Sequence, residues 1–366
     1  MTSDILYYAG PRALALISEG GLSPDMVDVV AGAAGGPKWL VLGHLDRFLF
    51  SRWFQGRQRP LFLLGASIGA WRFAAASRRD PAGALDAFEK AYIYQFYRRR
   101  PTPAEVSRES RRIMSAYLGN DGISEILDHP YLRLSFLTVR CRHAGAADSS
   151  LLQTAGLAGA VAANLAGRRW LKYFFSRVLF HHPAGVPPCW PLNEFSPRRV
   201  PLAPENLKDA LLASGSIPLV MAGVRGIAGA PAGTYRDGGA IDYHLDIPHR
   251  LPEDRIVLFP HYSARIIPGW LDKPLPWRRP SPATLENMLM VAPSPSFIAG
   301  LPHGKIADRK DFYRFAGNDN GRIDTWHAVS AGGRRLAAAF ADDVDSGRIR
   351  QMVRPFPGLK ASETAD

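Results

Sequence analysis

The chain has 366 residues, of which 46% are hydrophobic, and this composition excludes a protein that is disordered throughout. Its 45 Lys and Arg residues outnumber the 33 Asp and Glu residues, so the formal net charge is +12, which favours anionic partners. The two cysteines, Cys141 and Cys189, are too few for a disulfide framework and suit a reducing compartment.

The N-terminal segment contains Asp4 and Glu19 and lacks the basic start and apolar core of a signal peptide. No uninterrupted apolar window reaches the length of about 18 residues that a transmembrane helix needs. We find no zinc-finger spacing, RNA-recognition signature or basic region followed by heptads, so we expect no nucleic-acid partner. We therefore expect a cytoplasmic protein whose basic charge favours peripheral contact with anionic membranes, with a surface basic only for solubility as the alternative.

The first unit in chain order is a strand, a glycine-rich loop and a helix. Residues 28–31 form a short apolar run, residues 32–37 form a glycine-rich turn, and apolar residues then recur at helical spacing over 39–49. The backbone N–H groups of Gly35 and Gly36, just before a helix N-terminus, would attract a developing negative charge. A phosphate-binding P-loop is the rival interpretation, but no Gly-Lys-Ser or Gly-Lys-Thr is present.

A second unit of the same kind has the sequence LFLLGASIGAWRF over residues 61–73. Its apolar run ends in Gly65-Ala66-Ser67-Ile68-Gly69, and a helix then begins that is expected to stop at Asp80-Pro81. A strand, a tight glycine turn and a helix are the context that a nucleophile elbow requires, because flanking glycines tolerate the crowded backbone. A buried strand–helix junction without chemistry is the alternative. Two such units in succession predict an α/β fold with parallel strands.

The middle of the chain contains two basic helical regions with a strand between them. Residues 82–127 have a helical pattern with basic runs at 98–100 and 111–112, and residues 131–140 alternate as a strand does. Residues 151–180 have a helical pattern in which Arg and Lys interleave with aromatic residues. An interfacial membrane helix has this pattern, but so does a core-packed helix with a basic outer face, which is the favoured interpretation.

The later part of the chain contains a strand between two proline-rich loops. The loops are predicted over 183–204 and 266–282, and the second is expected to expose Trp270, Trp277 and two arginines. Residues 256–259 are predicted to form a buried strand.

No internal repeat or long polar linker divides the chain into independent units. We therefore expect a single domain over residues 1–350, followed by a polar tail over 351–366. The motifs of its core lie in 26–250, and residues 251–350 form a C-terminal extension.

A carboxylate on a glycine turn is the candidate base for Ser67. In the sequence GTYRDGGAIDYHLDIP, Asp237 directly precedes Gly238 and Gly239, beyond a loop with the sequence ASGSIP over 213–218. Small residues around a carboxylate let another backbone and a serine approach closely. An Asx-type turn in a surface loop is the alternative, because Asp-Gly often forms one.

Four short motifs thus occur in a fixed order along the chain. They are Gly35-Gly36-Pro37-Lys38, Gly65-Ala66-Ser67-Ile68-Gly69, Ser214-Gly215-Ser216-Ile217-Pro218 and Asp237-Gly238-Gly239. Together they resemble the patatin-like phospholipases over residues 26 to about 250, and the combination is far less probable by chance than any one motif. The resemblance implies an α/β fold of three layers, α/β/α, with a mainly parallel central sheet.

The resemblance also implies a role for each matching residue. Ser67 would be the nucleophile and Asp237 its base, in a dyad without histidine. Gly35 and Gly36 would donate the oxyanion hydrogen bonds, and Lys38 matches the family's basic position. The remaining motif glycines, which support the two turns, are Gly65, Gly69, Gly238 and Gly239.

Two residues depart from the family pattern. Ala34 stands where the family has the first of three glycines, and Trp39 stands where it has a glycine after the basic residue. Neither change removes a backbone N–H that the mechanism needs. Trp39 is expected to reshape the acyl pocket, so that a substrate ester reaches Ser67 past its ring.

The residues and the resemblance together predict a lipid acyl hydrolase of the phospholipase, lysophospholipase or esterase type, with no cofactor or metal implied. One alternative is an α/β-hydrolase with a Ser–Asp–His triad, since histidines follow Asp237 in the required order. These histidines are His244, His249, His261, His303 and His327. The other alternative is a non-catalytic scaffold that binds membrane or protein through the same fold.

Overall fold

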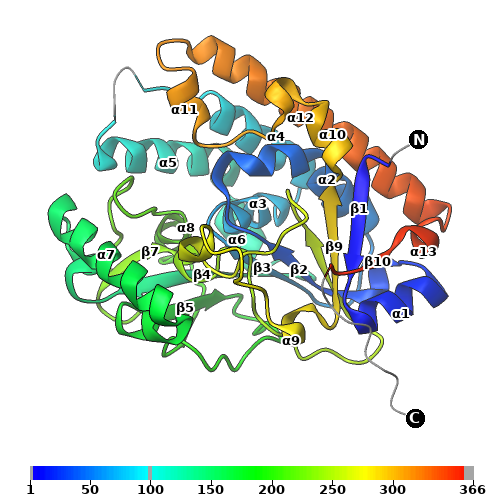
Figure 1. Cartoon of the computed structure of the whole chain (residues 1–366), viewed down its shortest axis with the longest axis horizontal. Helices are drawn as coiled ribbons and strands as arrows, with labels where there is room; N and C mark the ends of the chain where they lie inside the picture. Colours follow the sequence, from blue (N-terminus) through cyan, green and yellow to red (C-terminus); the bar gives the residue numbers. More distant parts are fainter. Residues whose placement is uncertain (1–2, 98–100, 358–366) are drawn as a thin grey trace.

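Within residues 3–97 and 101–357, which the computed structural model describes, a ten-stranded β-sheet forms the centre of the molecule (Figure 1). The strands follow the order β10-β1-β9-β8-β2-β3-β4-β5-β6, and β7 pairs with β4 off this path. The strands are β1 (Ile5–Ala9), β2 (Val27–Gly32), β3 (Leu61–Ala66), β4 (Leu132–Cys141), β5 (Phe175–His181), β6 (Arg198–Pro201), β7 (Thr234–Asp237), β8 (Ile256–Pro260), β9 (Met288–Pro293) and β10 (Arg354–Pro355).

The sheet is mostly parallel, as predicted. Strand β2 pairs in parallel with β3 and β8, and β3 pairs in parallel with β4. The pairs β1–β9, β4–β5 and β4–β7 are antiparallel. Every residue of β8 and β9 is buried, which is the pattern of strands covered on both faces. The expected α/β class is confirmed, and the arrangement is consistent with three layers, α/β/α.

Helices pack around this sheet, and Figure 1 shows the long helix α12 beside α2 and α4, against which it packs. No helix of the described residues is both long and apolar enough to cross a membrane. The helices are α1 (Pro11–Gly20), α2 (Gly43–Phe48), α3 (Ile68–Ala76), α4 (Pro81–Ile93), α5 (Pro103–Leu118), α6 (Gly122–Leu127), α7 (Ser150–Ala166), α8 (Leu207–Ser214), α9 (Pro282–Leu285), α10 (Pro295–Ala299), α11 (Asp311–Arg314), α12 (Asp319–Asp345) and α13 (Ile349–Met352).

Strand β4 brings two distant segments of the chain end to end. Strand β3 pairs with the first part of β4 and ends at Ala66, opposite Leu137. Strand β7 pairs with the remainder of β4 in the opposite direction and ends at Asp237, opposite Thr138. Because Leu137 and Thr138 are consecutive, the C-terminal ends of β3 and β7 meet at one peptide of β4. This register places Ser67 beside Asp237, although the two residues are 170 positions apart.

The predicted helix over residues 151–180 is wrong in its last part. Helix α7 ends at Ala166, a 3₁₀ segment (η5) spans Arg168–Tyr173, and Phe175–His181 form strand β5. All 7 residues of β5 are buried, and the strand pairs with both β4 and β6. The strand buries Ser176, Arg177 and His181 together with its apolar residues, so it lacks the alternation that marks a half-buried strand, and periodicity alone does not distinguish it from a helix.

Three smaller expectations also need correction or fall outside the structure. Asp80 does not end α3, which stops at Ala76; it caps α4 by accepting a 3.0 Å hydrogen bond from the Gly83 N–H. The predicted tail over 351–366 begins inside the fold, because β10 pairs with β1. The basic run at 98–100 lies outside the described residues.

Candidate active site

Ser67 lies on a strained turn between β3 and α3. Its backbone has φ 55° and ψ −126°, a conformation that costs a residue with a side chain about 1–3 kcal/mol. A Cβ on Gly65 would lie 2.5 Å from the Ala70 nitrogen, and a Cβ on Gly69 would collide with the Gly32 carbonyl oxygen. Both glycines of the motif are therefore required by the close packing of the helix against two strands. The turn has the geometry expected of a nucleophile elbow.

The carboxylate of Asp237 accepts a hydrogen bond directly from this serine. Ser67 Oγ lies 2.7 Å from Asp237 Oδ2, and the Gly239 N–H donates to Asp237 Oδ1 at 2.7 Å. Both side chains are buried, and burial raises the pKa of Asp237, while the hydrogen bond from Ser67 opposes that shift. A raised pKa makes the carboxylate a stronger base for the serine proton. A Cβ on Gly238 would collide with the Leu137 carbonyl oxygen, so this turn also requires its glycine.

Two serines of the small-residue segment at the end of α8 hold the pair in place. The Ser67 N–H donates to Ser214 Oγ at 3.0 Å, and Ser214 Oγ donates to the Leu137 carbonyl at 2.8 Å. The Asp237 N–H donates to the Ser216 carbonyl at 3.0 Å. The sequence motif included both serines, but it did not indicate that they orient the backbone on each side of the dyad.

The loop that contains Gly35 and Gly36 is fixed through the residue before it. The Ala34 N–H donates to the Tyr243 carbonyl at 2.9 Å, and the Ala34 carbonyl accepts from Tyr262 Oη at 2.6 Å. Gly36 has φ 58°, a left-handed conformation that favours glycine. Among the described residues, neither Gly35 nor Gly36 donates its N–H to a hydrogen-bond acceptor. Both N–H groups are therefore unpaired within this part of the chain, which makes them candidate donors to an oxyanion.

His244 supports this loop from behind and does not join the dyad. The Ile267 N–H donates to His244 Nδ1 at 3.0 Å, which fixes the proton on Nε2, 2.7 Å from Tyr262 Oη. The proton of Tyr262 is in turn directed to Ala34. Burial lowers the pKa of His244 well below its usual value, so the ring stays neutral in this chain of hydrogen bonds. Sequence reasoning proposed His244 only as a triad candidate and missed this positioning role, since nothing in the local pattern links it to Ala34.

The other histidines after Asp237 are also separate from it. His261 is buried against the rings of His244 and Tyr262, His249 is buried elsewhere, and His303 and His327 are exposed. Among the described residues, none of these side chains lines the pocket at Ser67, and Asp237 has Ser67 as its direct side-chain partner. The geometry therefore favours a two-residue arrangement over a Ser–Asp–His triad.

A pocket of about 340 Å³ opens beside the dyad. It reaches Ser67, Asp237, Gly35 and Gly239, whereas Gly36 does not line it. Its apolar lining residues are Leu157, Phe175, Ile217, Pro218, Trp270 and Leu271. Its lining cations are Lys38, Lys273, Arg309 and Lys310, and Asp308 also lines it. The pocket is thus amphipathic, with the dyad among its lining residues.

The expectation for Trp39 is wrong. Its ring is fully buried and stacks on Phe88, with 4.4 Å between ring centroids, and it does not line the pocket. The residue before it, Lys38, does line the pocket, with Nζ 4.8 Å from the centroid of the Tyr262 ring. Residues of a 3₁₀ segment point in different directions, so Lys38 and Trp39 face the pocket and the core respectively.

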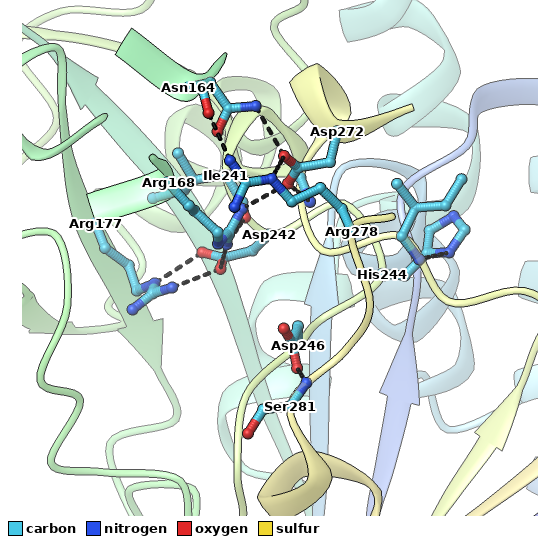
Figure 2. A network of polar contacts seen from close by, with 12 residues as sticks. Asn164, Arg168, Arg177, Ile241, Asp242, His244, Asp246, Asp272, Arg278 and Ser281 are labelled. Atoms are coloured by element: carbon cyan, nitrogen blue, oxygen red, sulfur yellow. Dashed lines mark hydrogen bonds and ion pairs between the residues drawn. The ribbon is translucent and has the colours of Figure 1, made fainter. Parts of the chain in front are cut away.

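A buried network of charges holds the apolar wall of the pocket in place (Figure 2). Asp242 accepts two hydrogen bonds from Arg177, at 2.6 and 2.8 Å. Asp272 is the last residue of the 3₁₀ segment η7 (Trp270–Asp272) and accepts from Arg168 at 3.0 Å and from Asn164 at 2.8 Å. The bonds to Asp272 tie α7 and η5 to the loop that carries Trp270 and Lys273, and the bonds to Asp242 tie β5 to the segment that follows β7.

Arg278 joins the same network, which corrects one expectation. It was predicted to be exposed, but it donates to the Asn164 carbonyl at 2.6 Å and lies 3.7 Å from Asp272. Trp270 and Trp277 are exposed as predicted, with 42% and 65% of their surface accessible. The carboxylates Asp242 and Asp272 were not identified from the sequence, because their arginine partners lie on separate elements.

Comparisons with known proteins identify no family for the chain. No protein-family model matches it, and no curated protein matches its sequence. Among solved structures, the crystal structure of VipD from Legionella pneumophila aligns at 10% identity and a TM-score of 0.32. The alignment covers 71% of this chain and 53% of VipD, so the chain matches about half the length of that protein. A likeness at this level establishes neither a family nor an activity.

Proposed function

We propose that the protein is a serine acyl-ester hydrolase of the patatin-like type. The observation that carries the proposal is the direct 2.7 Å hydrogen bond from Ser67, on its strained turn, to the buried carboxylate of Asp237. The free N–H groups of Gly35 and Gly36 and the order of the four sequence motifs support it. A non-catalytic scaffold has no use for a strained serine paired with a base.

The chemistry follows from the positions of these groups. Ser67 Oγ attacks the ester carbonyl carbon as its proton passes to Asp237 Oδ2. The N–H groups of Gly35 and Gly36 stabilise the oxyanion of the tetrahedral intermediate. When the intermediate collapses, the ester C–O bond breaks, and Asp237 gives its proton to the departing alcohol. Asp237 then takes a proton from water, whose oxygen attacks the acyl-enzyme carbonyl carbon. When this second intermediate collapses, the bond from that carbon to Ser67 Oγ breaks, Asp237 returns the proton to Ser67 Oγ, and the acid leaves.

The apolar side of the pocket indicates an acyl chain as the part of the substrate that binds there. Leu157, Phe175 and Leu271 offer the hydrophobic surface that an alkyl chain buries favourably. A volume of about 340 Å³ is near the lower end for small-molecule sites, which favours one chain over two. The proposed substrates are therefore lipid esters, such as lysophospholipids, phospholipids that present one chain, or glycerides.

Helix α7 has an unusual distribution of polar and apolar side chains. Its buried face consists of Gln153, Gly156, Ala160 and Asn164, whereas Leu151, Leu152 and Leu165 are exposed and Leu157 lines the pocket. The interpretation of this region as a core-packed helix with a basic outer face is therefore wrong. We name the exposed apolar residues on α7, η5 and the 266–282 loop the pocket rim: Leu151, Leu152, Val161, Leu165, Trp170, Tyr173, Trp270 and Trp277.

The pocket rim supports peripheral contact with an anionic membrane as part of the proposed function. The cations Arg169 and Lys172 lie over the rings of Trp170 and Tyr173, at 5.2 and 5.3 Å from the centroids. Aromatic residues interleaved with cations are typical of protein surfaces at the lipid headgroup level. Leu157 of α7 and Trp270 also line the pocket, so a bound membrane would present lipid at its entrance. Residence in the cytoplasm belongs to the same proposal.

A fluorophosphonate probe tests the activity. Its phosphorus should form a bond with Ser67 Oγ and expel fluoride, and intact-mass measurement should show one adduct on the wild type. Ser67→Ala should remove the adduct, and Ser67→Ala and Asp237→Asn should each lower hydrolysis of a lipid-ester panel by about a thousandfold or more. Ser115→Ala, an exposed serine on α5, is the matched control and should behave as the wild type. Equal labelling of Ser67→Ala, or no labelling of the wild type, would contradict the proposal.

A further inference from the structure

Three basic side chains from separate segments converge on the wall of the pocket that also holds Ser67. Lys38 belongs to the 3₁₀ segment η2 (Gly36–Leu42), Lys273 follows η7, and Arg309 precedes α11. Lys273 Nζ lies 3.9 Å from the centroid of the Tyr243 ring, as Lys38 Nζ lies over Tyr262. The aromatic faces support both ammonium groups without neutralising them.

No carboxylate of the described residues forms a direct ion pair with these cations. Within that part of the chain, Lys38, Lys273 and Arg309 have no carboxylate oxygen within 4.0 Å. Asp308 also lines the pocket and acts on Lys38 at longer range, but it pairs with Lys305 at 3.2 Å. Asp237 acts on Lys273 at longer range, and its two oxygens accept hydrogen bonds from Ser67 and Gly239.

The three cations also repel one another. Burial, together with the charges of Lys38 and Arg309, lowers the pKa of Lys273 to about 7, while the charge of Asp237 opposes the shift. Burial also lowers the pKa of Lys38; the charge of Asp308 opposes this shift, and the charge of Arg309 adds to it. Like charges held together in a partly buried site are unfavourable until an anion binds between them.

Arg309 places this positive charge beside the oxyanion loop. A Cβ on Gly36 would lie 2.9 Å from Arg309 Nε, so the guanidinium packs directly against that glycine. The apolar residues Leu157 and Phe175 also line the pocket. An anionic group bound at the cations would therefore belong to the head of the substrate, near the ester carbonyl, and the alkyl chain would contact these apolar residues.

We propose that Lys38, Lys273 and Arg309 form an anion-binding subsite, and that the preferred substrate is a single-chain ester with an anionic head group. The preferred substrate rests on the proposed hydrolase function. The binding of an anion at the subsite does not depend on hydrolysis. A phosphate and a carboxylate share the necessary chemistry, since both accept charge-assisted hydrogen bonds from Lys and Arg.

The kinetic test compares a phosphate-bearing, a carboxylate-bearing and a neutral monoacyl ester of the same chain length. Lys273→Met and Arg309→Gln should each lower the ratio of kcat/KM for the anionic ester to that for the neutral ester by about tenfold or more, as loss of a charged hydrogen bond implies. Lys90→Met, an exposed lysine on α4, should leave all three values unchanged. The head group is identified as the anion, phosphate or carboxylate, for which this ratio of kcat/KM values falls. An unchanged ratio for both anions in both variants would overturn the proposal.

A binding test separates the subsite from the hydrolase proposal. Octyl phosphate, octanoate and octanol contain no ester carbonyl for Ser67 to attack, and their affinities for Ser67→Ala are measured by calorimetry. The subsite predicts that an anionic octyl compound binds at least about tenfold more tightly than octanol, and that Lys273→Met removes this preference. Equal affinities for the three compounds would overturn the subsite even if the wild type hydrolyses esters. A preference for the anion in a protein without esterase activity would overturn only the proposed function.

Discussion

Two groups of basic side chains lie close to the pocket and differ in what surrounds them. Arg168 and Arg177 are neutralised by the buried carboxylates of Asp272 and Asp242 (Figure 2). Lys273 and Arg309, on the pocket wall, have no such partner among the described residues. A buried arginine that is paired with a carboxylate is neutralised within the fold and needs no ligand. A group of cations without a carboxylate partner is neutralised only when an anion binds.

The largest effect is expected from a variant that breaks an ion pair of the neutralised group. Asp242→Asn would leave Arg177, which is 3% exposed, without a charge partner. Removal of one partner of a buried pair typically destabilises a protein by about 3–5 kcal/mol, because the other charge stays buried. Urea unfolding should show this loss. Asp148→Asn, which breaks the exposed pair with Arg225, is the control and should have a much smaller effect. Similar small effects in both variants would contradict the comparison.

On the pocket wall, Lys273→Met is expected to change the free energy of unfolding by a smaller amount and in the opposite direction. The folded pKa of Lys273 is about 7, below the value near 10.4 of an unfolded chain. Between these values the unfolded state binds more protons, so the stability of the wild type should rise with pH relative to Lys273→Met. Below pH 7 both states are protonated, and the variant should be the more stable protein because it lacks the unneutralised charge.

Urea unfolding of both proteins at pH values of about 6 and about 9 measures this difference. Lys90→Met serves as the control, since its side chain is exposed, and its difference from the wild type should not change with pH. If Lys273→Met behaves like Lys90→Met, the charge of Lys273 is not destabilising, and the contrast between the two groups of cations fails.

The smallest effect is expected at the pocket rim, where the cations are proposed to contact a membrane surface and not a partner inside the protein. The double variant Leu151→Ser and Leu165→Ser should bind vesicles that contain anionic lipid several-fold more weakly, because less apolar surface enters the interface. Sedimentation with vesicles measures the binding. Tyr94→Ser, an exposed residue whose ring packs against His327, should bind as the wild type does. Binding that is indifferent to anionic lipid and to salt would contradict the membrane proposal.

The local parts of the site were predictable from the sequence, and the long-range parts were not. The strand, glycine turn and helix around Ser67 depend on neighbouring residues, as does the glycine turn after Asp237. The support of Ala34 by Tyr262 and His244 depends on segments more than 200 positions apart, which no local pattern reveals. Strand β5 was missed for a different reason, since complete burial removes the alternation that distinguishes a strand.

The residues of the pocket wall also divide into those that the sequence predicts and those that it does not. Lys38 was identified because it follows the glycine pair, whereas Lys273 and Arg309 come from loops without a motif. Trp39 was placed wrongly, since its neighbours in sequence are pocket residues but its side chain packs on Phe88 of α4. Side-chain direction in a short 3₁₀ segment depends on tertiary packing and not on composition.

The meeting of β3 and β7 on β4 has a consequence for how the protein gains its reactivity during folding. The serine turn consists of one strand and the helix that follows it, whereas its base lies on a strand 170 positions later that pairs with the same strand, β4. Closing so long a loop is slow and entropically unfavourable compared with local steps. A chain synthesised only as far as β5 would therefore hold a serine without its proton acceptor. Under the proposed function, such an incomplete chain would be inert, and reactivity would appear only with the docking of β7.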